Sequence, residues 1–193
     1  NYHRCLFGVY KTPNQHRRGL IMAKYDVTPT GVERTFAANE FIVSKTDTKG
    51  RLLYINKTFM EIADYTEGEL HNQPHSIIRH PDMPRGVFKL LWDRIESGKE
   101  IFAYVMNMTK FGDHYWVIAH VTPSYDAKGK HCGYHSNRRV PSKSALNVIK
   151  PIYKEMLSIE ASSRKDGPSD SVAYLQSLLD EKGVSYDEFI FGL

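Results

Sequence analysis

Alternation of apolar and polar residues marks five short stretches of this chain as strands. Residues 41–43 and 52–56 flank a glycine-containing turn at 46–50, a pattern that predicts a β-hairpin. Three more strand-like runs follow after residue 100, and glycine-bearing turns separate them. These runs are residues 101–109, 115–125 and 131–140. The second group is therefore predicted to form an antiparallel meander.

A helical region is predicted between the hairpin and the meander. Asn56 is placed to cap a helix over residues 57–65, and prolines break residues 69–84 into loops and one-turn helices. Residues 85–97 are amphipathic, with bulky apolar side chains assigned to one face. These side chains are Val87, Phe88, Leu91, Trp92 and Ile95. The predicted fold class is α+β: a five-stranded antiparallel sheet with short helices covering one face, a pocket between them, and a trailing C-terminal helix.

The pattern divides the chain into three parts. Residues 1–39 are predicted to be an irregular arm, residues 40–141 the central domain, and residues 142–193 a helical extension. The extension carries an apolar stripe and a last amphipathic helix at 172–179. The stripe consists of Ile149, Ile152, Tyr153 and Met156. It is expected either to pack on the chain's own domain or to contact a partner.

Composition excludes several classes of protein. The 193 residues include 26 basic and 22 acidic ones, spread without a basic stripe, so no nucleic-acid partner is expected. Cys5 and Cys132 are too far apart for a cysteine-rich metal site, and two cysteines in no recognisable framework favour a reducing compartment. No run of residues is long and apolar enough to span a membrane. A soluble, cytoplasmic protein is expected.

Two motifs are the most specific feature of the sequence. The run Arg-His-Pro-Asp-Met-Pro at 79–84 precedes Gly-Asp-His-Tyr-Trp-Val at 112–117. Further residues extend this pattern along the chain, and their order and spacing add to its specificity. They are Gln73-Pro74-His75, Phe88, Trp92, Gly98, Asn107 and Thr122-Pro123. With this order of elements, the chain resembles the flavin-binding PAS domains of bacterial aerotaxis receptors and of the separate PAS subunits of bipartite energy-taxis systems. The likeness extends over residues 40–157, and the PAS domain is assigned to residues 40–141.

The resemblance implies a function. It implies non-covalently bound FAD and a redox sensor, not an enzyme, that reports respiratory or oxygen status to a chemotaxis receptor. The partner would be a chemoreceptor or another signalling protein, reached from the cytoplasm, with recruitment to a membrane receptor. A homodimer through the segments that flank the PAS domain is a further expectation.

The expected site combines residues named by the resemblance with residues suited to flavin chemistry. By family position, Asn56, Phe88, Trp92 and Asn107 would line the flavin, and Arg79, His80 and Asp82 would lie near its polar portion. Trp116 can contribute to an aromatic slot, and Phe102 stands where the family often has Trp. A second departure is Met108-Thr109, where the family often has two arginines.

Each site residue also has a purely structural interpretation. The aromatic residues can be ordinary core. Asn107 can be an exposed strand residue, although a buried amide could pair with a flavin edge. Asp82 can cap a short helix and pair with Arg79 without touching a ligand. Of Arg79 and His80, only one is expected to contact the cofactor.

Other functions remain as alternatives. His75 and His80 lie where haem-binding PAS domains place an axial ligand, so haem is the less favoured cofactor. No histidine spacing predicts a zinc site, no cysteine lies where photoactive flavin domains form an adduct, and no nucleophile motif predicts an enzyme. The alternative function is a PAS dimerisation or interaction module with haem, a small molecule or no ligand.

Overall fold

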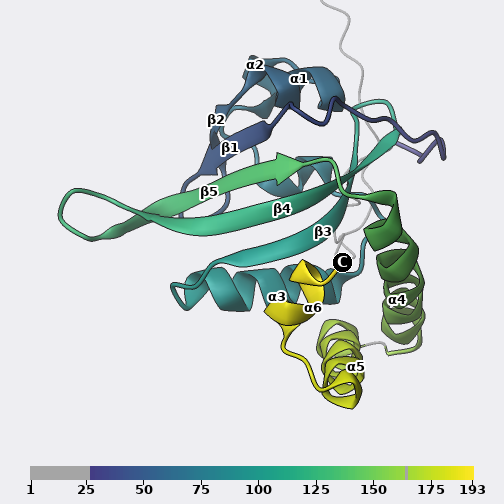
Figure 1. Cartoon of the computed structure of the whole chain (residues 1–193). Coiled ribbons are helices and arrows are strands. Elements are labelled where there is room, and N and C mark those ends of the chain that lie inside the picture. Colours follow the sequence, from purple (N-terminus) through teal and green to yellow (C-terminus); the bar gives the residue numbers. More distant parts are fainter. Residues whose placement is uncertain (1–26, 164) are drawn as a thin grey trace, which may run out of the picture.

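The computed structural model describes residues 27–163 and 165–193, which include a single curved antiparallel sheet (Figure 1). The five strands lie in the order β2-β1-β5-β4-β3, and every neighbouring pair is antiparallel. Their bounds are β1 (Ile42–Thr46), β2 (Leu52–Ile55), β3 (Ile101–Met108), β4 (His114–Tyr125) and β5 (His131–Arg139). The predicted hairpin and meander are confirmed, and β5 joins them by pairing with both β1 and β4.

Four short helical elements connect β2 to β3. They are α1 (Lys57–Ala63), α2 (Glu67–Leu70), the 3₁₀ helix η1 (His75–Ile78) and α3 (Arg85–Glu96). Asn56 caps α1 as predicted, because its Oδ1 accepts a hydrogen bond from the Phe59 amide at 3.2 Å. These elements cover the inner face of the sheet, so the α+β prediction with helices on one face is confirmed.

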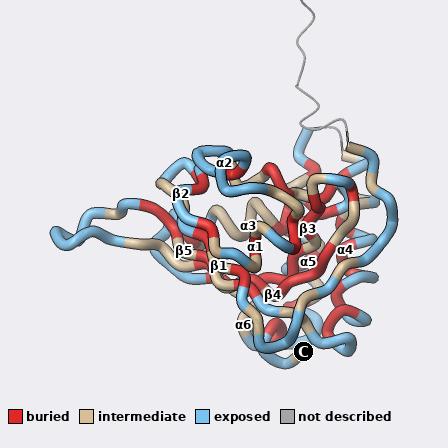
Figure 2. The backbone as a smooth tube through the Cα atoms, turned by 90° about the horizontal axis from the view of Figure 1, so that it is seen from above, coloured by how far each residue is buried: buried red, intermediate tan, exposed pale blue. Residues whose placement is uncertain are grey.

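Strand alternation decides which side chains meet those helices. On β3 the side chains of odd-numbered residues such as Val105 and Asn107 point to the inner face, and the even-numbered ones point outward. Inner-face residues of the neighbouring strands include Ala119 on β4 and Tyr134 on β5. Figure 2 shows that the buried positions concentrate in the strands, whereas the β4–β5 hairpin projects as an exposed loop.

The described part of the N-terminal arm is attached to the β3–β4 turn. The Thr30 amide donates to the Gly112 carbonyl at 3.0 Å, and Glu33 forms an isolated parallel bridge with His114. Gly112 permits this approach because a Cβ there would lie 2.4 Å from the Thr28 carbonyl oxygen. The rest of the predicted arm, residues 1–26, lies outside the described residues.

The C-terminal extension folds back onto the domain. It contains α4 (Lys143–Ser162), α5 (Gly167–Lys182) and α6 (Tyr186–Phe191), so the last helix predicted at 172–179 is longer than expected and α6 was missed. The extension packs on a second side of α3. The sequence pattern predicted a single apolar face for this helix and did not distinguish this second side. Val87 and Leu90 of α3 meet apolar side chains of all three C-terminal helices. The predicted apolar stripe of α4 is buried within the chain.

Two tyrosines of the extension close the free edge of β3. The Tyr153 hydroxyl donates to the Tyr104 carbonyl at 2.7 Å, and the Tyr186 hydroxyl donates to the Phe102 carbonyl at 2.9 Å. An exposed strand edge offers unpaired carbonyls to other chains. These two hydroxyls satisfy alternate carbonyls of that edge, so the extension completes the sheet.

Removing one of these hydroxyls should cost stability. Tyr153→Phe is expected to lower the free energy of unfolding by about 1 kcal/mol, because the Tyr104 carbonyl loses its partner in a buried site. Tyr54→Phe on the exposed part of β2 is the control and should change little. Urea unfolding checks both variants. Equal stabilities would mean that the edge is closed by other contacts.

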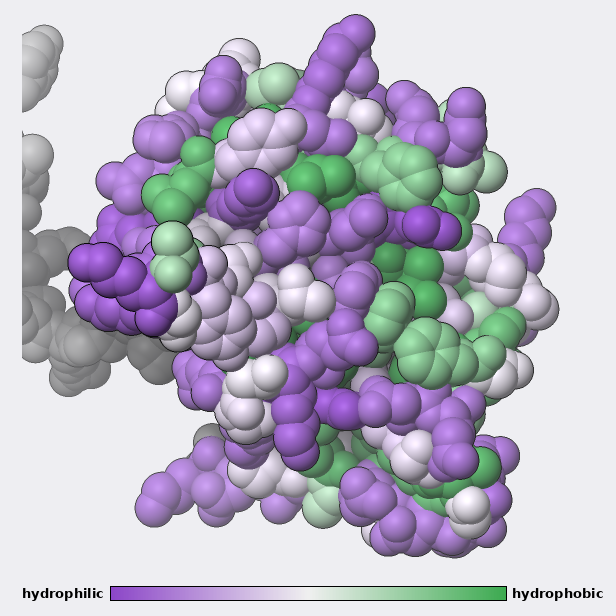
Figure 3. All heavy atoms as spheres, turned by 60° about the vertical axis from the view of Figure 1, so that its left-hand side comes forward, coloured by the Kyte–Doolittle hydropathy of each residue, from purple (hydrophilic) through white to green (hydrophobic). Residues whose placement is uncertain are grey.

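On the face drawn in Figure 3, apolar side chains gather mainly in the half away from the grey trace, with hydrophilic side chains between and around them. Large exposed apolar side chains are dispersed over several elements. They include Val32, Leu53, Phe111, Val148 and Phe191. None of the described helices has the length and apolar character needed to cross a membrane.

Candidate functional site: a cavity between α3 and the sheet

A cavity of about 160 Å³ lies between the inner face of the sheet and the helices that cover it. One water requires only about 10–15 Å³ by this kind of measure, so the space suits a much larger ligand. α3 contributes Phe88, Leu91, Trp92 and Ile95 to one wall, and η1 with Arg79 contributes another. The floor comes from alternate residues of four strands: Ser44, Thr46, Val105, Asn107, Ala119, Val121, Tyr134, Ser136 and Arg138.

The aromatic wall has a defined geometry. The rings of Trp92 and Tyr134 meet edge to face, with centroids 5.4 Å apart and planes at 87°. Gly50 in the β1–β2 turn borders the same tryptophan, and a Cβ at Gly50 would lie 3.1 Å from its ring. An apolar slot with a few polar groups is typical of a site for a flat heterocyclic ligand.

A buried arginine in the floor is the strongest polar feature. Arg138 is only 1% exposed, donates from Nε to the Ser136 hydroxyl at 3.1 Å and from Nη2 to the Ser44 hydroxyl, and lies over the Phe59 ring at 4.7 Å. Its Nη1 has no hydrogen-bond partner among the described residues, and no carboxylate of the described chain pairs with it. Burial lowers the pKa of Arg138 to about 10, which still leaves it charged at neutral pH.

An uncompensated charge of this kind is costly to bury. A guanidinium in a low-dielectric site normally pairs with an anion or with several acceptors, because desolvation otherwise disfavours the charged form. Arg138 has only two neutral hydroxyls and one aromatic face. The floor therefore suits a ligand that brings an electron-rich or negatively charged acceptor.

Asn107 and Arg79 are further polar residues that border the cavity. The Asn107 side chain is 3% exposed and makes no hydrogen bond within the described part of the chain. Arg79 lies with its guanidinium carbon 3.7 Å from the centre of the Phe88 ring, and its Nε lacks a partner among residues 27–163 and 165–193. Burial lowers the pKa of Arg79. Both groups can hydrogen-bond to a ligand without breaking an existing side-chain contact.

The structure brings four of the nine predicted site residues together in this cavity: Arg79, Phe88, Trp92 and Asn107. Their segments are linked through the backbone as well, since Arg79 and Asn107 form an isolated antiparallel bridge. The run at 79–84 also covers the β3 edge, where the Met106 amide donates to the Met83 sulfur at 3.5 Å. The motif region thus forms one wall of the cavity and part of the edge of the sheet.

Phe102 and Trp116 lie on the opposite face of the sheet, which corrects the expectation that they line the slot. The Phe102 ring stacks on His120 at 4.1 Å between centroids, and Trp116 lies 6.2 Å from the ring of Tyr153 on α4. The reason is strand parity: both are outward positions of β3 and β4. The change from Trp to Phe at 102 therefore bears on the outer face and not on the cavity.

The other three predicted site residues also lie outside the cavity lining. Asn56 uses its side chain within the fold, accepting from the Val43 and Phe59 amides and donating to the Phe41 carbonyl. His80 is 4% exposed, and its Nδ1 accepts from the Asp82 amide at 3.1 Å. The Asp82 side chain is mostly exposed and lies 4.0 Å from that nitrogen, so it faces His80 and not Arg79.

His80 also lies against the partly buried His114. The His80 and His114 rings are 5.8 Å apart. Burial lowers the pKa of His80, and the charge of His114 lowers it further, although Asp82 acts in the opposite direction. Of the two histidines that suggest haem, only His75 contributes to the described lining of the cavity. Arg79 is likewise the only lining residue of the pair Arg79 and His80.

The residues that sequence reasoning missed are those of the central strands. Ser44 and Ser136 are opposed in the β1–β5 register, and Arg138 follows two positions later on the same face. Their signal was parity: on the predicted strand 131–140, the face that carries Tyr134 also carries Ser136 and Arg138. A polar and charged row on an inward face is unusual enough to indicate a binding site.

Comparison with known proteins agrees with this geometry. Residues 52–137 match the PAS fold family. Their fold is therefore the PAS fold, as expected from the sequence.

The similarity to an aerotaxis receptor is also confirmed. The aerotaxis receptor of Escherichia coli (strain K12) is 36% identical over 123 residues, which cover 64% of this chain and 24% of the receptor. Phototropin-2 of Oryza sativa subsp. japonica is 27% identical over 79 residues, or 41% of this chain and 9% of that protein. The chain thus spans a small part of the length of these relatives.

Solved structures show the same fold. A light-oxygen-voltage domain studied with a flavin analogue has a TM-score of 0.51 at 15% identity, covering 60% of this chain and 86% of that one. The light-state structure of the aureochrome 1 light-oxygen-voltage domain has a TM-score of 0.51 at 16% identity, covering 58% and 88%. At these identities the likeness establishes the fold alone.

Proposed function

We propose that this protein is a PAS redox sensor that holds FAD non-covalently in the cavity and signals respiratory or oxygen status to a chemotaxis receptor by protein contact. The observation that carries the proposal is the buried Arg138 at the floor of an aromatic-walled cavity, where the described chain supplies no anion to pair with it. The similarity to an aerotaxis receptor supports the sensory role.

The residues present fit a flavin. Its flat ring suits the slot between α3 and the sheet, where Trp92 and Phe88 offer apolar faces. Its pyrimidine edge carries carbonyl oxygens and nitrogens, for which Asn107 offers a donor and an acceptor and Arg138 a charged donor. Bound there, the flavin would supply reversible two-electron chemistry. Arg138 would favour forms with negative charge on the facing edge.

Asn107 is the proposed link between redox state and strand β3. Asn107 would hydrogen-bond a ring nitrogen of the bound flavin through its amide nitrogen or its amide oxygen, according to whether that ring nitrogen accepts or donates in the given redox state. Because Asn107 makes no competing side-chain hydrogen bond in the described chain, its amide is free to turn. Its backbone bridge to Arg79 would carry the change into the helical wall.

This role gives a testable expectation for Asn107. Asn107→Leu should leave the ligand-free protein as stable as the wild type or slightly more stable, because the amide has no side-chain hydrogen bond to lose among the described residues. The same change should weaken FAD binding about tenfold, or about 1.4 kcal/mol. Asn137→Leu, on the outward face of β5, is the matched control and should bind FAD normally. Unchanged binding by Asn107→Leu would remove this residue from the site.

The partner and the location are part of the proposal. A cytoplasmic sensor would meet a membrane-bound chemoreceptor through protein contact, and the segments that flank the PAS domain could also pair two copies. Sensing and not catalysis is proposed, since the relative that shares 36% identity is an aerotaxis receptor. Light-driven adduct chemistry receives no support, because the described cavity lining contains no cysteine and Cys132 is exposed on β5.

The absorption spectrum of protein purified from cells tests the proposal. Flavin bands, release of FAD and not FMN by acid, and reversible bleaching by dithionite are expected. A red protein with haem bands would favour the alternative cofactor, with His75 in the cavity as the candidate ligand. A colourless protein that fails to take up added FAD would leave the alternative of a PAS interaction module.

A further inference from the structure

Helix α3 lies between the cavity and the C-terminal extension. Phe88, Leu91 and Trp92 face the cavity, whereas Val87 and Leu90 pack against the extension. A change in what fills the cavity therefore acts on one side of a helix whose other side is bound to α4, α5 and α6.

The N-terminus of α3 is held by a glutamate from α4. Pro84 precedes α3 and provides no side-chain cap. Instead Glu160 accepts from the Arg85 amide at 3.0 Å and from the Gly86 amide at 2.7 Å, satisfying two of the free amides of the first turn. It also accepts from Arg85 Nε at 3.2 Å and from the Ser171 hydroxyl at 2.8 Å. One carboxylate thus joins α3, α4 and α5.

The hydrogen bonds to α3 and α5 stabilise Glu160 at a position that otherwise disfavours a carboxylate. It is 8% exposed and lies in the last turn of α4, where the negative end of that helix disfavours a carboxylate. Burial alone would raise its pKa, but the hydrogen bonds from Gly86, Arg85 and Ser171 outweigh burial and lower the pKa. The N-terminal end of α3 supplies the compensation that α4 cannot.

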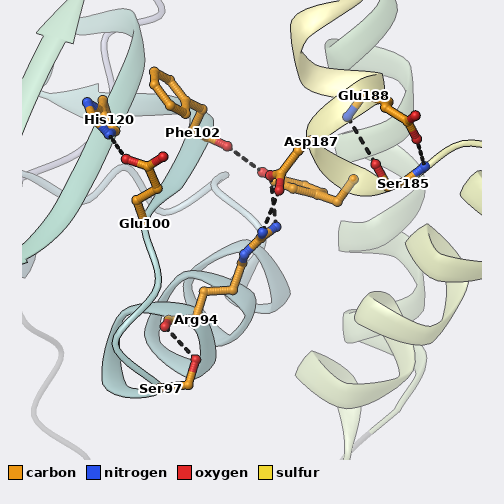
Figure 4. A network of polar contacts seen from close by, with 9 residues as sticks. Arg94, Ser97, Glu100, Phe102, His120, Ser185, Asp187 and Glu188 are labelled. Carbon is orange, nitrogen blue, oxygen red and sulfur yellow. Dashed lines mark hydrogen bonds and ion pairs between the residues drawn. The ribbon is translucent and has the colours of Figure 1, made fainter.

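The other end of α3 is held by the last helix (Figure 4). Arg94 forms two hydrogen bonds to the Asp187 carboxylate, at 2.9 and 2.6 Å. The same guanidinium lies 5.5 Å from the ring of Tyr186, whose hydroxyl donates to the β3 backbone at Phe102. α3 is therefore fixed to the extension at both of its ends.

We propose that the C-terminal extension is the element that reads the state of the cavity, with Glu160 and Asp187 as the two contacts that couple it to α3. A ligand change that shifts α3 must either move the extension with it or break one of these charged contacts. Coupling of this kind is reciprocal, so a change at the contacts must also alter ligand affinity. The identity of the ligand, FAD, rests on the proposed function; the mechanical coupling does not.

Hydrogen exchange measured by mass spectrometry tests the coupling on the full chain. Glu160→Gln puts an amide NH₂ among four donors, and it should speed exchange of ligand-free protein about tenfold in both α3 and α5. Glu155→Gln, an exposed position of the same helix, is the matched control and should change neither. Asp187→Asn breaks only the second contact and serves if Glu160→Gln does not fold.

The ligand arm uses added FAD. In the wild type, FAD should slow exchange in α5 and α6, outside the described cavity lining, and Glu160→Gln should weaken FAD binding about tenfold. Faster exchange confined to the extension, with α3 and FAD affinity unchanged, would overturn the coupling. A wild type that binds no FAD would contradict the proposed function instead, and the exchange of the ligand-free variants would still decide the coupling.

Discussion

Arg138→Met is expected to make the ligand-free protein more stable and to lower its affinity for FAD. The variant removes a buried charge that, among the described residues, is hydrogen-bonded to only two hydroxyls and lies over one aromatic ring. The free energy of unfolding should therefore rise by about 1–3 kcal/mol. FAD affinity should fall between about tenfold and a hundredfold, since a hydrogen bond to a charged group is worth about 1.5–3 kcal/mol. Urea unfolding and flavin fluorescence measure the two effects.

The neighbouring arginine provides the control. Arg139 is exposed on the outer side of β5, over the ring of Phe41, so Arg139→Met should leave FAD affinity unchanged. If Arg138→Met raises the free energy of unfolding and lowers FAD affinity, the arginine serves ligand binding at a cost in stability. If Arg138→Met destabilises the ligand-free protein and binds FAD normally, the arginine is a structural residue and the cavity lacks its proposed polar floor.

Gly86→Ala is expected to lower the free energy of unfolding by about 1–3 kcal/mol. A Cβ at Gly86 would lie 2.1 Å from the Ser171 hydroxyl oxygen and 3.0 Å from the Pro168 carbonyl, so α3 and α5 can approach this closely only at a glycine. The Ser171 hydroxyl cannot yield easily, because it is buried and bonded to Glu160. The clash should outweigh the gain in helix propensity.

Gly68→Ala is the matched substitution. Gly68 also lies in a helix, α2, but a Cβ there would meet nothing within 4 Å. It should therefore be neutral or slightly stabilising. Chemical unfolding compares the two variants. A Gly86→Ala protein as stable as Gly68→Ala would show that the extension does not dock on α3 in solution.

Local pattern was enough to predict the PAS sheet and the helices over it. Apolar alternation and glycine turns located the strands, and Asn56 was predicted to cap α1 because capping depends on residues close in sequence. The motif residues Arg79 and Asn107 reached the cavity because the run at 79–84 and strand β3 are adjacent in the fold. Each of these features is encoded over short stretches of chain.

Features that depend on distant parts of the chain were not predicted. Phe102 was assigned to the slot by family position and Trp116 by residue type, but strand register sends both to the outer face. Val87 was grouped with the cavity side of α3 because no local pattern indicates a second packing surface, which only the return of the C-terminal helices creates. Arg138 is significant only once β5 pairs with β1 and places it beside Ser44.

A crystal structure of the protein with FAD bound tests the proposed flavin site most directly. We expect the flavin ring between α3 and the sheet, with ring acceptors within about 3 Å of Arg138 Nη1 and of the Asn107 amide. Flavin bound elsewhere on the molecule, with the cavity empty or closed by its own side chains, would contradict it.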